Sequence, residues 1–104
     1  MTRLRLKPGV RLLGLQPQAV LGIMVARTVY AAFGIPELVV TSVTDGKHGR
    51  GSLHYKGLAF DLRTRNVDPD IIPSLVAALK DALGSEFDVV FEGDHIHVEW
   101  DPKE

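Results

Sequence analysis

Residues 87–100 read FDVVFEGDHIHVEW, and this stretch predicts a β-hairpin. Phe87–Phe91 is a short run of β-branched and aromatic residues, and Gly93-Asp94 suits a tight turn of two residues. In the second arm, His95–Trp100, apolar and polar residues alternate, as they do in a strand with one buried face. The polar face of this arm carries His95, His97 and Glu99, and the apolar face carries Ile96, Val98 and Trp100.

Upstream of the hairpin, apolar residues recur at helical spacing in two segments and at strand spacing in others. The predicted helices begin at Pro17 and near Asp70, and each ends at a glycine, Gly34 or Gly84. The predicted strands are Leu38–Ser42 and Leu58–Arg63, with residues 43–53 as a loop between them. Residues 3–7 alternate as well, and we interpret them as a short edge strand or an ordered arm.

This order of elements predicts an α+β fold, in which a small, mostly antiparallel sheet has two helices packed on one face. At 104 residues the chain is expected to form a single domain, residues 1–104. The helices would cover the side of Phe60 and Val98, and a metal site would lie on the opposite face. The residues predicted to be core include Phe60, Trp100 and the apolar face of the first helix, with Val20, Ile23, Met24 and Ala31.

The composition narrows the chemistry that this chain can perform. Its 45% hydrophobic and 24% charged residues are ordinary globular values, and the absence of cysteine excludes zinc fingers, thiol catalysis and iron–sulfur clusters. The net charge of −1 argues against a nucleic-acid binder driven by bulk charge. Residues 51–104 hold eleven of the 13 acids and three of the 4 histidines. A metal site built from imidazoles and carboxylates has this composition, as does a solvated acidic face.

Three residues supply the ligands that a catalytic zinc needs, with a fourth position left for water. They are His54, Asp61 and His97, the last from the hairpin strand. His54 and Asp61 are seven residues apart, which on one straight strand would place them on opposite faces. Gly57 interrupts the run, so we expect His54 to lie on the loop and to fold back toward Asp61. Ala59 shares the face of Asp61, and its small side chain leaves room above the sheet.

The string Ser52-x-His54-x-x-Gly57-x-Ala59-x-Asp61, followed by His97, resembles the zinc D-alanyl-D-alanine carboxypeptidase family. That family also includes D-Ala-D-Ala dipeptidases, phage endolysins that cut L-alanyl-D-glutamate bonds, and the metal-binding fold of hedgehog signalling domains. The resemblance extends from about Val39 to Asp101. It implies a zinc metallopeptidase that hydrolyses a peptide bond in bacterial peptidoglycan by attack of a zinc-activated water, with His54, Asp61 and His97 as the zinc ligands.

Two arguments nominate different carboxylates as the general base. In a hairpin with Gly93-Asp94 at its turn, Glu92 faces His95 across the strands, on the side of His97, so geometry favours Glu92. The resemblance instead implies the acid three residues before the last ligand, which is Asp94. The resemblance implies that Asp94 projects from the turn over the open coordination position. We expect Asp94 to be the base, because a base must reach the metal-bound water.

Further residues are expected on the substrate side of the site. His95 shares a face with His97 and is interpreted as a substrate-side group or as a support for the ligands. Family members place an arginine ahead of the first motif to hold substrate oxygens, and the candidates here are Arg50 and Lys47. Ser52 belongs to the same region and is expected to order the loop through side-chain hydrogen bonds. His48, in the glycine-rich loop, is interpreted as solvent-exposed.

Other assignments fit the sequence less well. A cupin needs more strands after its His-x-His, but only seven residues follow His97. A His-Asn-His nuclease needs a basic groove, which is not visible in this sequence. The main alternative is therefore a non-catalytic module of the same fold that binds metal or peptide in recognition or assembly.

The expected partner is a peptidoglycan peptide, with no nucleic acid and no membrane, and the chain is expected to be a monomer. The apolar run Ala19–Ala26 is too short for a membrane span, and Gly14, Pro17 and Gln18 separate it from the basic start. We therefore expect no signal peptide and synthesis in the cytoplasm. A phage origin, with release to the cell wall by a holin or on a virion, is consistent with this expectation.

Overall fold

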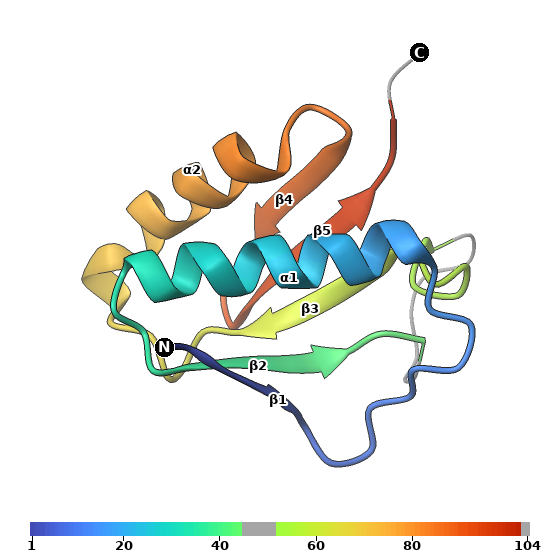
Figure 1. The fold of residues 1–104 in the computed structure, drawn as a ribbon, viewed down its shortest axis with the longest axis horizontal. Helices are drawn as coiled ribbons and strands as arrows, with labels where there is room; N and C mark the ends of the chain where they lie inside the picture. Colours follow the sequence, from blue (N-terminus) through green and yellow to red (C-terminus); the bar gives the residue numbers. More distant parts are fainter. Residues whose placement is uncertain (45–51, 103–104) are drawn as a thin grey trace.

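The computed structural model describes residues 1–44 and 52–102, which form a five-stranded sheet and two α-helices (Figure 1). The strands lie in the order β1-β2-β3-β5-β4. β1 runs parallel to β2, and all other neighbouring strands are antiparallel. The bounds are β1 Arg3–Leu6, β2 Glu37–Ser42, β3 Ala59–Arg63, β4 Phe87–Phe91 and β5 His95–Trp100. The predicted α+β class with a mostly antiparallel sheet is confirmed.

Both helices lie on one face of this sheet. α1 (Pro17–Ala32) crosses the sheet, and α2 (Ile72–Leu83) lies beside it next to β4 (Figure 1). A short 3-10 turn, Pro69–Ile71, leads into α2, and the Asp68 side chain accepts a hydrogen bond from the backbone N–H of Asp70 at 2.9 Å. Among the described residues, neither helix is both long and apolar enough to cross a membrane.

The core lies between the helices and the inner face of the sheet. Its fully buried members include Phe60 and Leu62 from β3 and Ile96 and Val98 from β5. α1 approaches closely at Gly22, where an added Cβ would lie 3.0 Å from ring atoms of both Phe60 and Phe87. The small residues of α1 thus select which of its sides is buried.

The prediction for the buried side of α1 is partly wrong. Ile23 is buried, but Val20 and Met24 are 42% and 46% exposed, and Ala31 is exposed as well. Because α1 is apolar on most of its sides, periodicity did not single out the face that packs. The buried set is Ala19, Gly22, Ile23, Ala26, Val29 and Tyr30. Trp100, also predicted to be core, is only half-buried, and its ring N–H points to a Glu86 carboxylate oxygen at 3.4 Å.

The opposite face of the sheet carries the charged and metal-ligating side chains. β3 and β5 pair so that Asp61 lies across from His97 and Arg63 across from His95. Since side chains alternate along each strand, these four residues project away from the helices. β1 is the edge strand next to β2, and its pairing puts Arg3 and Arg5 on this same face.

Candidate metal centre

Asp61, His97 and His54 converge on one point beside the sheet. Asp61 Oδ1 lies 3.0 Å from His97 Nδ1 and 3.2 Å from His54 Nε2. The two imidazole nitrogens are themselves 3.2 Å apart. His54 and Asp61 are buried, and His97 is half-buried. Three potential ligand atoms therefore face each other in a largely enclosed position.

His54 reaches this position from a tight turn over residues 53–57, as the sequence predicted. The carbonyl oxygen of His54 accepts a hydrogen bond from Gly57 N–H at 3.0 Å, and Ser52 Oγ accepts one from His54 N–H at 3.2 Å. Gly57 has a φ of +71°, and an added Cβ would lie 2.0 Å from the carbonyl oxygen of Gly14. Only glycine fits both the backbone conformation and this close approach. The expected loop-ordering role of Ser52 agrees with its bond to His54.

The outer nitrogens of both histidines are held by acceptors. His54 Nδ1–H donates to the Val43 carbonyl oxygen at 2.6 Å, and His97 Nε2–H donates to Glu99 Oε1 at 2.7 Å. A hydrogen bond to the outer nitrogen of a metal-ligating histidine fixes the tautomer, so that the inner nitrogen presents its lone pair. Here the inner nitrogens are Nε2 of His54 and Nδ1 of His97, the two atoms beside Asp61.

These distances fit a metal ion. With zinc–nitrogen bonds of about 2.0–2.1 Å, two ligands at a tetrahedral angle lie about 3.3 Å apart. The three separations observed here, 3.0, 3.2 and 3.2 Å, are close to that value. Two imidazole lone pairs and a carboxylate at such separations repel each other unless a cation lies among them. The group is thus compatible with a bound metal ion.

The pKa values of His97 and Asp61 also indicate that positive charge is favoured at this position. Hydrogen bonding to Asp61, supported by Glu99, raises the pKa of His97 to about 9 against the opposing effect of burial. Burial favours a higher pKa for Asp61, but hydrogen bonds from His54 and His97 outweigh it and hold that pKa well below its usual range. Without a metal, a proton on His97 therefore supplies the positive charge, and a metal ion must displace that proton.

The two carboxylates considered as general bases both pair with His95. Glu92 lies opposite His95 across the hairpin, and its Oε1 is 3.3 Å from His95 Nε2. Asp94 contacts His95 Nδ1 and has a side chain that is 89% exposed. His95 Nε2 is in turn 3.9 Å from Asp61 Oδ2. Burial lowers the pKa of His95, but these three carboxylates outweigh burial and raise it.

The substrate-side predictions have different outcomes. Arg50, together with Lys47 and His48, lies outside the described residues. The structure places His95 beside Asp61, on the side of that carboxylate away from His54. A pocket of about 510 Å³ adjoins Asp61, His95 and Asp94 there.

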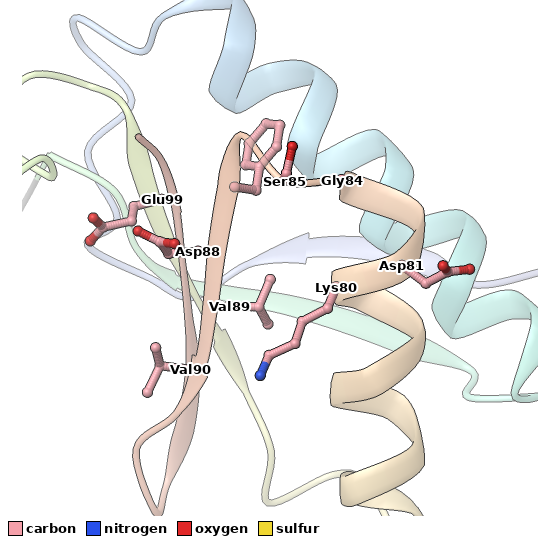
Figure 2. A pocket seen from close by; sticks show the side chains of 9 residues that line it. Lys80, Asp81, Gly84, Ser85, Asp88, Val89, Val90 and Glu99 are labelled. Carbon is pink, nitrogen blue, oxygen red and sulfur yellow. The ribbon is translucent and has the colours of Figure 1, made fainter. Parts of the chain in front are cut away.

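Sequence reasoning missed the role of Glu99. Alternation placed Glu99 on the face of His97, but its hydrogen bond depends on side-chain conformation, which spacing does not give. Asp88 lies across from Glu99 in the β4–β5 pairing, and Figure 2 shows both side chains on the side of the strands away from α2. With Asp101 they form a second acidic group, at one border of a hollow of about 740 Å³. That hollow, between α2 and β4, is lined by none of the three converging ligands, but Glu99 borders it and also contacts His97.

Comparison with known proteins does not assign the site to a family. The sequence matches no protein-family model and no curated protein. The case for a metal centre therefore rests on the geometry of His54, Asp61 and His97, and the resemblance to zinc carboxypeptidases rests on the motif residues.

Proposed function

We propose that this protein is a zinc-dependent peptidase that hydrolyses a peptide bond in bacterial peptidoglycan. The observation that carries the proposal is the convergence of His54 Nε2, Asp61 Oδ1 and His97 Nδ1 within 3.2 Å of one another. Three protein ligands are typical of catalytic zinc sites, whereas structural zinc sites are closed by four. The choice of peptidoglycan follows from the motif that contains Ser52, His54 and Asp61.

Zinc is the metal that this ligand set favours. Two imidazoles and one carboxylate form the donor set of several zinc hydrolases, and a site without cysteine still satisfies zinc. Calcium and magnesium prefer six or more oxygen ligands, but only Asp61 contributes oxygen here. When bound, zinc would lower the pKa of water and polarise the substrate carbonyl.

The chain's own residues would bind the metal, hold their tautomers and handle protons. Val43 and Glu99 keep the donor nitrogens of His54 and His97 aimed at the metal position. We propose Asp94 as the general base, since it borders the same pocket as Asp61, whereas Glu92 does not line that pocket. The exposed Asp94 side chain can rotate, and His95 between Asp94 and Asp61 is placed to position it.

A second candidate is a non-catalytic module that binds metal or peptide. It is favoured by one observation: both acids that could act as base are paired with His95 rather than with the three ligands. In that case the metal would organise a recognition surface without turnover.

Digestion of purified peptidoglycan separates the two candidates. The peptidase should release new amino termini, lose this activity with a chelator and regain it with zinc, and mass spectrometry of defined muropeptides would identify the bond. His54→Ala should be inactive, and His48→Ala serves as a matched imidazole control that retains activity. Zinc binding without any release of amino termini would contradict the peptidase and favour the module.

A further inference from the structure

The pocket beside the metal centre has two walls of opposite character. Its volume is about 510 Å³, and one wall consists of Asp61, Asp94 and His95. The other wall carries three cations, Lys7, Arg63 and Arg65, which follow β1 or lie at the end of β3. Arg63 stands directly across from His95 in the β3–β5 pairing, so the two walls adjoin each other on neighbouring strands.

Within residues 1–44 and 52–102, no ion pair joins a cation of this pocket to a carboxylate. The neighbouring Arg5 differs from them, because it pairs with Glu37 at 3.1 Å. Lys7 and Arg65 are exposed, and Arg63 is half-buried. All three line the same pocket, so their positive charges lie close together on one side of it. A bound anion would relieve their mutual repulsion.

The opposite wall is already compensated. Asp94 pairs with His95, and Asp61 shares its charge with His97 and His54. An anionic ligand is therefore attracted to the cationic wall. Guanidinium groups bind a carboxylate through paired, charge-assisted hydrogen bonds, and Thr41 and Thr64 line the same pocket with further hydroxyl groups.

We propose that Arg63 and Arg65, with Lys7, form an anion subsite that binds a carboxylate of the peptide substrate next to the metal centre. This proposal rests on the proposed function for the nature of the ligand. A carboxylate on the cationic wall directs the neighbouring part of the peptide toward Asp61, because that residue borders both the pocket and the metal position. The peptide would then cross the sheet from β1 toward β5. The carboxylate could belong to the chain end or to a glutamate side chain.

Binding of small peptides to chelator-treated protein tests the subsite without turnover. The probes are N-acetyl-D-alanyl-D-alanine, its C-terminal amide, and an amide of the same length that contains one glutamate side chain. Calorimetry gives the affinities, and NMR shifts of the Arg63 and Arg65 side-chain N–H groups report the location. The double variant Arg63→Gln/Arg65→Gln removes the guanidinium groups. Arg3→Gln is the matched control, since Arg3 is an exposed strand arginine of the same face that does not line the pocket.

A carboxylate-bearing probe should bind more tightly than the uncharged amide and shift the arginine signals. The double variant should lose about tenfold or more of that affinity, while Arg3→Gln keeps it. Preference for the acid indicates a terminal carboxylate, and preference for the glutamate amide indicates a side-chain carboxylate. Equal binding of charged and uncharged probes, or a charge preference that survives in the double variant, would overturn the subsite.

The same titrations with zinc-loaded protein keep this proposal separate from the peptidase. The protein could bind a carboxylate through its arginines and yet release no amino termini. That result would support the subsite and contradict the peptidase. Carboxylate binding that requires zinc and has the same affinity in the double variant would show that the anion ligates the metal. That result would contradict the subsite.

Discussion

Asp61 and His97 lie directly opposite each other in the β3–β5 pair, and Asp61 Oδ1 is 3.0 Å from His97 Nδ1. This contact is fixed by strand register, so two of the three ligands are placed by the most regular part of the fold. The third, His54, depends instead on the turn that Gly57 permits. Strand register and the Gly57 turn are therefore two separate supports of the metal centre.

Replacing Glu99 should weaken metal binding although Glu99 is not one of the converging ligands. Its carboxylate accepts the Nε2 hydrogen of His97 and increases the basicity of the ligating nitrogen. Glu99→Gln should therefore lower zinc affinity about 10- to 100-fold, as measured by competition with a chromophoric chelator. Asp88→Asn, on the neighbouring strand and the same face, is the control and should change affinity little. Equal losses in both variants would indicate an effect of general negative charge.

Zinc binding should release protons in a way that reports the raised pKa of His97. Because that pKa is about 9, His97 is protonated at pH 7 without metal, and zinc must displace the proton. Calorimetry in buffers of different ionisation enthalpy should then show about one proton released by His97 per zinc, against about a quarter of a proton for a histidine with an ordinary pKa of about 6.5. The affinity should rise about tenfold per pH unit between pH 6 and 8. Affinity independent of pH over this range would contradict the account.

The metal-free protein should lose stability as the solution becomes alkaline. A group whose pKa is raised by folding stabilises the folded state while it is protonated, so the contribution of His97 is complete below about pH 6.5. It is lost as the pH rises through about 9. Urea unfolding in the presence of a chelator should show this decrease, and His97→Gln should remove it. A metal-free protein that becomes more stable between pH 7 and 9 would contradict this assignment.

The identity of the general base can be decided with two isosteric variants. Asp94→Asn should retain one zinc per chain and lose at least about 100-fold in turnover, the usual scale for a general base. Glu92→Gln should cost much less, because Glu92 does not border the pocket next to Asp61. The reverse result would identify Glu92 as the base, as strand geometry alone suggests.

Gly57 should be far less tolerant of substitution than Gly84, which also has a positive φ. Gly57 and Gly84 have φ values of +71° and +85°, but only at Gly57 would a Cβ clash, 2.0 Å from the Gly14 carbonyl oxygen. Gly84→Ala should cost about 1 kcal/mol from backbone strain, and Gly57→Ala several times more. Gly57→Ala should also weaken zinc binding, because the same turn holds His54. Similar unfolding midpoints for the two variants would contradict the close approach.

The sequence was sufficient for the parts of the fold that depend on local patterns. The apolar run Phe87–Phe91 and the alternation of His95–Trp100 predicted the two strands of the hairpin. Gly57 indicated that His54 leaves the strand. The buried side of α1 was not predictable in this way, because Val20 and Met24 are as apolar as the residues that pack. The close approach of Gly22 to Phe60 determines which side of α1 is buried, and that contact exists only in the folded chain.

The groups that surround the three candidate ligands could not be predicted from the sequence either. The acceptor for His54 is a backbone carbonyl at Val43, and backbone atoms leave no signature in residue types. The cationic wall combines Lys7 with Arg63 and Arg65, which are more than fifty residues away in the chain. The parallel pairing of β1 with β2 and the antiparallel pairing of β2 with β3 bring these residues together, and no local pattern specifies that strand order.

Zinc titration of chelator-treated protein, followed by calorimetry, tests the central claim most directly. The wild-type chain should bind one zinc ion at the site formed by His54, Asp61 and His97. His54→Ala, Asp61→Ala and His97→Ala should each lower the affinity by several orders of magnitude while circular dichroism shows a folded protein. His48→Ala and Asp88→Asn should bind as the wild type does. Absence of zinc binding by the wild-type chain, or binding that persists unchanged in the His97→Ala variant, would contradict the metal centre.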